Sequence, residues 1–275
     1  FGDKPELALP LVDQGVSRVD IQEQTGQILG VAGASFDIRE GSVVAAAYPS
    51  PVSGYLEPIG RVFDVVLGAL SQAIPDRTPA PAFGTVGVVT AGGKHPDSGN
   101  YFVAVFPYPG GYGGHSKGDG LVNGTPPVSM ANFMSIEASE HRYPLQFDEY
   151  ALRPDSGGAG EYMGGLGQEV EIEISSEKEI RLSMMSDRQK YPAKGLLGGL
   201  EGATVEVIKS DGTRPHPKAR SPLKPGEKLT LKFGGGAGYG PPANRVPAAI
   251  ENDLRNGYIT SAFANQYYGV SGEGE

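Results

Sequence analysis

A strict alternation of apolar and charged residues marks one short segment of the chain. Residues 168–174 place apolar side chains at every second position, with a carboxylate after most of them. The alternating positions are Val170, Ile172 and Ile174 on one face and Glu169, Glu171 and Glu173 on the other. A period of two predicts a strand with one buried face and one exposed face.

Other runs rich in apolar and β-branched residues predict further strands. They cover residues 27–34, 42–48, 83–90, 100–106, 145–152, 180–185, 204–209 and 229–233. We expect 83–90 to pair with 100–106 through the loop between them. We also expect 180–185 to pair with 168–174, and a turn at Ser210-Asp211-Gly212 to follow 204–209.

Helical spacing occurs in three segments. In residues 57–74 apolar side chains recur every three or four positions, Pro58 lies near the start, and Pro75 closes the segment, which predicts a helix. Two shorter helices are predicted near the C-terminus. They are residues 245–256, with Gly257 as the stop, and residues 259–268, with Thr260 or Ser261 as the cap.

The glycines are concentrated in three dense runs, at residues 110–115, 155–167 and 234–242. Glycine is needed where φ is positive or where another backbone comes close, so these runs predict fixed tight loops inside a folded body. The predicted fold class is therefore α+β, strand-rich, with a few helices and long ordered glycine-rich loops. We expect an N-terminal part, residues 1–142, and a β-rich C-terminal part, residues 143–275, with one continuous domain as the alternative.

Composition narrows the classes of function. The 275 residues carry a formal net charge of -9 and no basic cluster, which disfavours nucleic acid or an anionic membrane as a partner. The absence of cysteine removes disulfides, thiolate nucleophiles and cysteine-based zinc sites. No apolar run approaches the ~20 residues of a membrane span. These features fit a cytoplasmic protein, and the start at Phe1 fits a processed product, a fragment or half of a longer polypeptide.

Two segments carry candidate chemistry. His115 ends one glycine run and Asp119 follows it, a pair that could bind a substrate or orient a proton transfer; an ordinary surface loop is the alternative. Glu137 and Glu140 are three residues apart and share a helix face. With His141 they could form half of a metal site, or they could simply face solvent.

Three further patterns argue against particular kinds of site: an anion site, a P-loop and a serine nucleophile. The Gly-Gly-Lys-His sequence at residues 92–95 lies between two predicted strands rather than before a helix, which favours a hairpin loop over an anion site. Residues 234–240 have no Lys-Ser/Thr after them, so they do not form a P-loop. Ser156 lacks the flanking pattern of a nucleophile elbow, which argues against a Ser-His-Asp hydrolase.

Several motifs follow one another in a fixed order along nearly the whole chain. They are Gly41-Ser42, Pro58, Ala69-Leu70, Pro75, residues 110–120, Asn132, Glu137, Glu140, Tyr143-Pro144-Leu145, residues 152–160, 164–167, 223–227 and 234–242, Arg245, Asp253, Gly257 and residues 267–270. In this order they resemble the hydantoinase B/5-oxoprolinase family. Two positions depart from the family pattern: Met163 stands where a basic residue is usual, and Gly240-Pro241 lacks an intervening Asp.

The resemblance implies an ATP-dependent enzyme built from two kinds of subunit. A hydantoinase A-like part phosphorylates the carbonyl oxygen of a cyclic amide or of a ketone enol, and the hydantoinase B-like part then hydrolyses or carboxylates the activated species. Phosphorylation creates a good leaving group, and the second step needs an activated water and oxyanion stabilisation, for which glycine-rich loops can supply N–H donors.

This chain resembles the C-terminal half of a family member. The resemblance therefore implies that ATP binds the hydantoinase A-like partner, that a divalent metal binds the N-terminal hydantoinase B-like half as a separate chain, and that this chain binds neither. The expected function is a subunit of an ATP-dependent cyclic-amide hydrolase. A subunit of a ketone carboxylase and a non-catalytic structural subunit are the alternatives.

Catalytic residues are not assigned from the sequence. The expected substrate-binding residues are His115, Asp119, Asn132, Glu137, Asp155 and Ser156. Polar groups on such loops could orient a carbonyl or its phosphate. Hydrogen-bonded braces that only hold the loops are the alternative for His115, Asp119 and Asp155.

Overall fold

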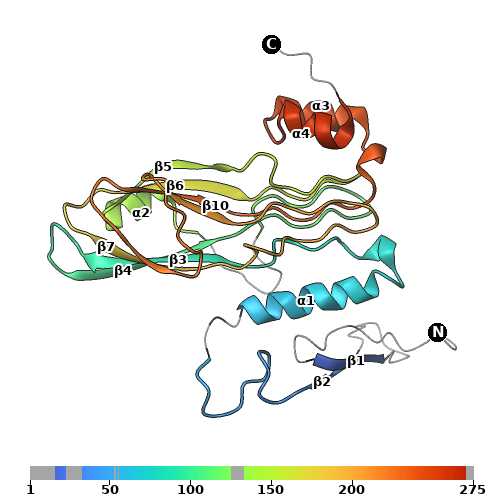
Figure 1. Ribbon diagram of the computed structural model, residues 1–275, viewed down its shortest axis with the longest axis horizontal. Coiled ribbons are helices and arrows are strands. Elements are labelled where there is room, and N and C mark those ends of the chain that lie inside the picture. Colours follow the sequence, from blue (N-terminus) through green and yellow to red (C-terminus); the bar gives the residue numbers. More distant parts are fainter. Residues whose placement is uncertain (1–15, 23–32, 53, 55, 125–132, 271–275) are drawn as a thin grey trace.

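Two four-stranded antiparallel sheets lie face to face in the computed structural model, which describes residues 16–22, 33–52, 54, 56–124 and 133–270 (Figure 1). The first sheet has the order β5-β6-β10-β8 and the second the order β4-β3-β7-β9. Their bounds are β3 (Gly87–Lys94), β4 (Tyr101–Tyr108), β5 (Leu145–Leu152), β6 (Gln168–Ile174), β7 (Ile180–Met185), β8 (Glu206–Lys209), β9 (Arg220–Leu223) and β10 (Lys228–Lys232). A separate antiparallel pair joins β1 (Val16–Gln22) to β2 (Gly33–Ile38).

The core lies between the two sheets. Every second residue of a strand points inward, and these residues form one buried apolar cluster that draws on both sheets. Val170, Ile172 and Ile174 of β6 are buried, as the alternation of this segment predicts. The second sheet combines β3 and β4 with β7 and β9, so it contains strands from both sides of residue 142. The expected α+β class is confirmed.

Most strands form where the sequence predicts them, but three expectations are wrong or incomplete. Residues 42–48 form turns instead of a strand, because the Ala45 N–H donates to the Ser42 carbonyl and the chain folds back on itself. The strand β9 was not predicted, and its Pro222 is tolerated because β9 lies at a sheet edge. The predicted strand at 27–34 falls largely outside the described residues.

The predicted pairing of 180–185 with 168–174 is also wrong. Strand β7 hydrogen-bonds β3 and β9, whereas β6 lies between β5 and β10 in the other sheet. Both segments bury their apolar faces in the same core. The residues between them therefore carry the chain across the sandwich instead of making a hairpin.

The helices lie beside the extended part of the fold, not on the sandwich alone. Helix α1 (Leu56–Leu70) lies along one side and α3 (Pro247–Arg255) and α4 (Ser261–Phe263) along the opposite side, while α2 (Ile136–Arg142) lies beside the sandwich (Figure 1). Short helical turns complete the set. They are η2 (Pro75–Arg77), η3 (Pro242–Asn244) and η4 (Ala264–Tyr268), which continues α4. No helix among the described residues is long and apolar enough to cross a membrane.

The glycine-rich runs continue from the sheets as extended segments that lie side by side between α1 and α3 (Figure 1). We call residues 80–86, 110–114, 156–167, 193–203 and 233–240 the glycine ribbons. Successive N–H groups of the last ribbon point at different neighbours. Gly236 donates to Gly165, Ala237 to Pro81, Gly238 to Leu200 and Tyr239 to Tyr162. Because 236 and 239 reach the same neighbour, the ribbon repeats every three residues, as a polyproline II-type helix does.

Close approach of backbones is the reason for glycine in the ribbons. A Cβ atom at Gly111 would overlap the Gly165 carbonyl, and one at Gly236 would overlap the Tyr112 carbonyl. No side chain fits where two extended backbones are in direct contact. The glycine runs are therefore fixed elements of the fold, as the sequence predicts, but they form one packed bundle instead of separate loops.

Candidate functional site

A buried arginine ties the glycine ribbons to the C-terminal helices. Arg245 directs its five N–H donors at three partners: the Asp119 carboxylate, the Asp253 carboxylate and the Glu161 carbonyl. The two bonds to Asp119 are both 2.8 Å long, and the bonds to Asp253 are 3.1 and 2.7 Å long. One side chain thus joins the segment after His115, a ribbon and α3.

The charges in this cluster compensate one another. Burial alone lowers the pKa of Arg245, but the hydrogen bonds and charges of Asp119 and Asp253 outweigh it and raise that pKa above its ordinary value. Burial raises the pKa of Asp253 despite Arg245, and it raises the pKa of Tyr268 to about 12. The Tyr268 ring centroid lies 5.8 Å from the Arg245 guanidinium carbon. Arg245 is consequently a permanent cation without a free donor.

Asp119 is the member of this cluster that reaches solvent. Its side chain is 43% exposed, whereas that of Arg245 is 2% exposed. Its Oδ1 also accepts a 2.6 Å hydrogen bond from the Met163 N–H. Met163 itself is buried in a small core with Leu166 and Ile250, so the residue that departs from the family pattern packs against the helices. Asp119 is held rigidly and still presents carboxylate lone pairs to a ligand.

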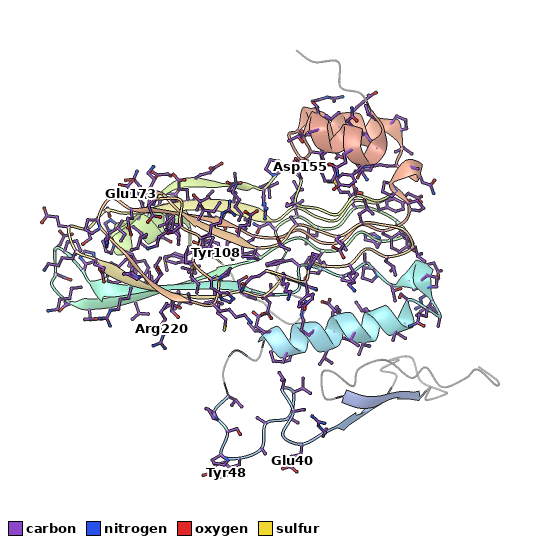
Figure 2. The ribbon with its side chains drawn as sticks, viewed as in Figure 1. Glu40, Tyr48, Tyr108, Asp155, Glu173 and Arg220 are labelled. Carbon is purple, nitrogen blue, oxygen red and sulfur yellow. The ribbon has the colours of Figure 1, made fainter. Side chains whose placement is uncertain are left out.

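Asp155 anchors the residue that caps helix α4. Its two carboxylate oxygens accept hydrogen bonds of 2.7 and 2.8 Å from the N–H and the hydroxyl of Thr260. Thr260 in turn accepts from the Phe263 N–H as the cap of α4, which confirms the predicted cap. Figure 2 shows Asp155 below the helical end of the molecule. Asp119 and Asp155 therefore both hold the α3–α4 region.

Ser156 and His115 have different environments. Ser156 is fully buried, and its hydroxyl donates to the Arg153 carbonyl and accepts from the Gly167 N–H, at 2.6 and 2.9 Å. His115 is exposed, and its Nδ1 accepts a 3.2 Å hydrogen bond from the Lys117 N–H. The neighbouring Ser116 hydroxyl donates to the Asp76 carbonyl. His115 thus lies on a tight turn anchored to η2, with its ring free to meet a ligand.

The remaining predicted residues are not part of this region. Glu137 lies on α2, exposed, at the opposite end of the molecule from α3 and α4 (Figure 1). Its predicted partner Glu140 accepts a 2.7 Å hydrogen bond from the Phe147 N–H. Asn132 lies outside the described residues. Asp119 and Asp155 thus each contact the C-terminal helical region, through Arg245 and Thr260, whereas Glu137 lies apart from it.

The ribbon N–H groups are already engaged. The amides of Gly114, Gly158 and Gly165 donate to Ala237, Gly236 and Tyr112 at 2.8 to 2.9 Å. These groups hold the bundle together, so they do not remain as donors for an oxyanion. Of the residues predicted to bind substrate in this region, Asp119 and His115 are the exposed ones, at the rim of the bundle.

A second ionisable cluster was not predicted from the sequence. Glu57, buried in the first turn of α1, accepts hydrogen bonds from the Thr85 hydroxyl and the Val86 N–H and lies within hydrogen-bonding reach of Asp187. Burial is the largest cause that raises the pKa of Glu57, and the charge of the Asp187 carboxylate adds to it, which brings this pKa to about 7. Burial alone raises the pKa of Asp187, but Lys218 and Glu57 hold it below its ordinary value. The pair shares one proton near neutral pH.

Two arginines share a carboxylate beside that pair. Asp64 of α1 accepts from Arg188 at 2.6 Å and lies 3.2 Å from Arg61. Arg188 has a φ of 60°, which is unusual for a residue with a side chain, and it also donates to the Phe83 carbonyl at 2.9 Å. No pattern along the chain points to this cluster, because its members come from segments more than 100 residues apart.

The described residues do not provide a metal site. Among residues 39–52, 54, 56–124 and 133–270, no three His, Asp or Glu side chains group so that they could hold a metal ion. Glu137, Glu140 and His141, for which a metal half-site and a solvent-facing helix face are the two alternatives, are all exposed on α2.

The chain belongs to the hydantoinase B/oxoprolinase family, whose family model matches residues 31–242. It is 32% identical to the beta subunit of the caprolactamase of Pseudomonas jessenii over 84% of this chain and 42% of that protein. It is 27% identical to the B-type subunit of a putative D-/L-hydantoinase of a Pseudomonas species, over 84% of this chain and 39% of that protein. The chain thus spans about two fifths of the length of these relatives.

Two solved structures share the fold. The ATP-dependent caprolactamase from Pseudomonas jessenii superposes on 89% of this chain, which covers 46% of that chain, with a TM-score of 0.76 and 26% identity. A nucleotide-free acetone carboxylase superposes on 78% of this chain, which covers 34% of that chain, with a TM-score of 0.68 and 19% identity. The second likeness shows the fold alone.

Proposed function

We propose that this chain is the B-type part of an ATP-dependent cyclic-amide hydrolase of the hydantoinase and oxoprolinase kind. The observation that carries the proposal is the match of 89% of the chain to an ATP-dependent caprolactamase, supported by 32% identity to the beta subunit of a caprolactamase. An amide is a poor electrophile, and ATP-dependent activation of its carbonyl oxygen makes ring opening feasible.

The proposal divides the chemistry between several parts. We place ATP on a hydantoinase A-like partner and the divalent metal on the remaining hydantoinase B-like polypeptide. The described residues of this chain do not fit a metal, and the chain spans about two fifths of its relatives. The contribution of this chain is to position the activated substrate through the exposed Asp119 carboxylate and the His115 ring, which the glycine ribbons and Arg245 hold in place.

The test is a reconstitution with defined substrates. We would assemble this chain with the hydantoinase A-like subunit and the remaining B-like polypeptide from the same source. ε-Caprolactam, hydantoin and 5-oxoproline would be supplied with ATP, and the ring-opened acid and phosphate would be measured. We expect one of these cyclic amides to be opened in an ATP-dependent reaction. An assembled complex that opens none of them would contradict the proposal.

A ketone carboxylase is the second candidate, because the fold also matches acetone carboxylase with a TM-score of 0.68. A parallel reaction with acetone, bicarbonate and ATP distinguishes the two. Formation of a carboxylated ketone without lactam hydrolysis would establish this alternative. ATP-independent stabilisation of the complex, without either product, would indicate the structural subunit.

A further inference from the structure

Aromatic rings fill the end of the sandwich core from which the ribbons continue. Tyr108 is the last residue of β4, and its ring stacks on that of Phe233 with 5.0 Å between the centroids. The rings of Phe133 and Tyr150 lie 5.4 and 6.4 Å from that of Tyr108. Figure 2 shows Tyr108 between the two sheets. The hydroxyls of the two tyrosines therefore accompany the aromatic packing into a core of apolar side chains.

The Tyr108 hydroxyl is buried without a direct partner. The side chain is fully buried, and no group in the described part of the chain forms a hydrogen bond with its Oη. Burial raises the pKa of Tyr108 well above its ordinary value, and Tyr150 raises it further. The hydroxyl therefore keeps its proton and remains both a donor and an acceptor. The large majority of buried polar groups in native proteins are bonded to protein or to ordered water, so an unbonded hydroxyl here would be an exception.

Gln168 is a second buried polar side chain at the same end of the core. It is the first residue of β6 and is 1% exposed, and neither polar atom of its amide has a hydrogen-bond partner among the described residues. Its backbone carbonyl accepts a 2.7 Å hydrogen bond from the Phe233 N–H, and the Phe233 ring is the one that stacks on Tyr108. The other inward-facing residues of β6 are apolar. The Gln168 amide brings two N–H donors and one carbonyl acceptor to this position.

Tyr150 of β5 connects these two groups. Burial raises the pKa of the Tyr150 hydroxyl, and the nearby Gln168 amide lowers it in part. The amide and this hydroxyl are therefore neighbours, although they do not meet in the geometry of a direct hydrogen bond. Tyr150 is half-buried and lies on an edge strand, so the group is nearest to solvent on this side. Two hydroxyls and one amide thus lie near one another without bonding directly.

The chemistry of this group selects a small neutral ligand. The buried charged side chains of the described residues are Glu57, Arg245 and Asp253, which belong to the clusters described above, so an ion bound here would lack a counter-charge. The rings pack with centroids 5.0 to 6.4 Å apart, which excludes an organic molecule between them. The ligand must accept a hydrogen bond from one group and donate to another. Water does both, and a buried water typically makes about three hydrogen bonds.

We propose that this end of the core binds a structural water molecule that bridges the Tyr108 hydroxyl, the Gln168 amide and the Tyr150 hydroxyl. The bridge joins β4 of one sheet to β5 and β6 of the other. It lies where β4 and β6 meet the glycine ribbons, so it fixes the two sheets relative to each other at the base of the bundle (Figure 1). A bridging water is nearly as favourable as a direct hydrogen bond. The site is a property of the fold and does not depend on the proposed function.

Tyr108→Phe gives a test whose sign depends on the water. A bridging water loses one hydrogen bond in this variant, so we expect the melting temperature of the full chain to fall by about 2 to 4 °C. An unbonded hydroxyl only costs stability, and its removal would leave the melting temperature unchanged or raise it, which would overturn the proposal. Tyr101→Phe is the control, at a tyrosine of the same strand that is 72% exposed, and should leave the melting temperature unchanged.

A double variant and a crystal structure identify the ligand. Gln168→Met replaces the amide by an apolar side chain of similar length, and we expect it to lower the melting temperature less in the Tyr108→Phe background than alone, because an apolar pair needs no water. Additive losses would show that the two groups share no ligand. In a high-resolution crystal structure of the unmodified chain we expect a water about 2.7 to 3.2 Å from the Tyr108 Oη and from the Gln168 amide. A direct bond between these two side chains, or no water between them, would contradict the proposal.

Discussion

At the scale of single residues, two buried charges determine how the glycine ribbons are anchored. Arg245 satisfies every donor with carboxylates and a carbonyl, whereas Glu57 is buried against another carboxylate, that of Asp187. The first arrangement leaves Arg245 charged and fully hydrogen-bonded. The second makes the stability of the chain depend on pH, because a carboxyl group that is raised to a pKa of about 7 must lose its proton near neutrality.

Removing Arg245 leaves Asp253 buried without its partner. We expect Arg245→Met to lower the free energy of unfolding by about 3 kcal/mol, since an unpaired buried carboxylate is strongly destabilising. Urea unfolding followed by circular dichroism measures it. Arg214→Met is the control, because Arg214 is 64% exposed and pairs with Glu206 on the surface, so its loss costs at most about 1 kcal/mol. Equal losses in the two variants would contradict the anchoring role.

The pH dependence follows from Glu57. The unfolded chain releases this proton near the ordinary value of 4.5, and the folded chain holds it up to about 7. The folded state therefore binds more protons in this window, and the free energy of unfolding falls as pH rises from 4.5 to 7. Burial is the first cause that raises the pKa of Glu57, and the charge of Asp187 is the next. Lys218 and Arg61 lower the pKa of Asp187 in turn.

Glu57→Gln removes the proton exchange while keeping the shape of the side chain. We expect this variant to lose the decline between pH 5 and 7 and to exceed the wild type at pH 8 by about 2 kcal/mol. Unfolding midpoints across pH 5 to 8 provide the measurement. Glu137→Gln, at an exposed carboxylate on α2, should keep the wild-type decline. A decline that survives Glu57→Gln would assign the effect to another group.

At the scale of elements, the ribbons are held by backbone contact and not by side chains. Adjacent segments exchange hydrogen bonds in three directions, and their glycines leave no room for a Cβ atom. Such an element is stiff, because every segment is fixed by several neighbours. It can therefore carry the exposed turn of His115 and the Asp119 carboxylate at fixed positions relative to α3.

Gly158 tests the packing of the ribbons. A Cβ atom there would overlap the Leu200 carbonyl and lie 2.6 Å from the Gly238 nitrogen, so Gly158→Val forces the ribbons apart. The backbone at Gly158 does not need a positive φ, so close approach is the cause. We expect at least about 3 kcal/mol of lost stability, or loss of soluble protein, because overpacking of a rigid interior is costly.

Gly68→Ala is the matched change on α1, where a Cβ atom meets nothing within 4 Å. Alanine in a helix is more favourable than glycine by up to about 1 kcal/mol, so this control should be neutral or stabilising. Thermal unfolding of both variants gives the comparison. Wild-type stability of Gly158→Val would show that the ribbons separate freely.

At the scale of the whole molecule, this chain is a rigid scaffold with one polar rim. The rim holds Asp119 and His115 beside the ribbons. In the proposed function, the nucleotide chemistry belongs to another subunit. Turnover then requires the assembled complex, although a variant can assemble and still fail to turn over the substrate.

The proposed function places ATP on the partner and substrate positioning on this chain, which predicts how the chain behaves alone and in the complex. Without partners we expect no ATP-dependent lactam hydrolysis and no ATP binding by calorimetry. In the complex, His115→Ala and Asp119→Ala should lower turnover about tenfold or more while leaving the nucleotide affinity of the partner unchanged, since the proposed function places these residues at the activated substrate and the nucleotide on the partner. Asp119→Asn can keep the bond from the Met163 N–H but loses the bidentate ion pair with Arg245, so circular dichroism and urea unfolding of this variant measure how much of any loss is structural.

ATP bound by the isolated chain, or a parallel loss of nucleotide affinity in the two alanine variants, would contradict this division. Unchanged turnover in both variants would show that these residues only hold the loops through their hydrogen bonds. Lys224→Ala, at an exposed loop residue far along the chain from the rim, serves as the control and should retain full turnover.

The family motifs and most elements are encoded locally. Strands β5, β6 and β7 begin and end where the sequence predicts, because alternation along a half-buried strand is a property of neighbouring residues. The helix predicted at 57–74 appears as α1 (Leu56–Leu70), because apolar spacing of three to four residues is also a local property, but it ends four residues earlier than predicted, in turns before Pro75. Pairing is not local, so the sheet that β7 joins, and the existence of the edge strand β9, were decided by how apolar faces meet across the core.

The sequence by itself therefore determined most of the elements, the α+β class, the family resemblance and the presence of rigid glycine segments. Only the tertiary structure decided that these segments form one bundle, that Arg245 joins Asp119 to Asp253, and that Glu57 meets Asp187. The physical reason is distance along the chain: periodicity reports the surroundings of a residue within a few positions. Contacts between residues more than 100 positions apart arise only when the whole chain has packed.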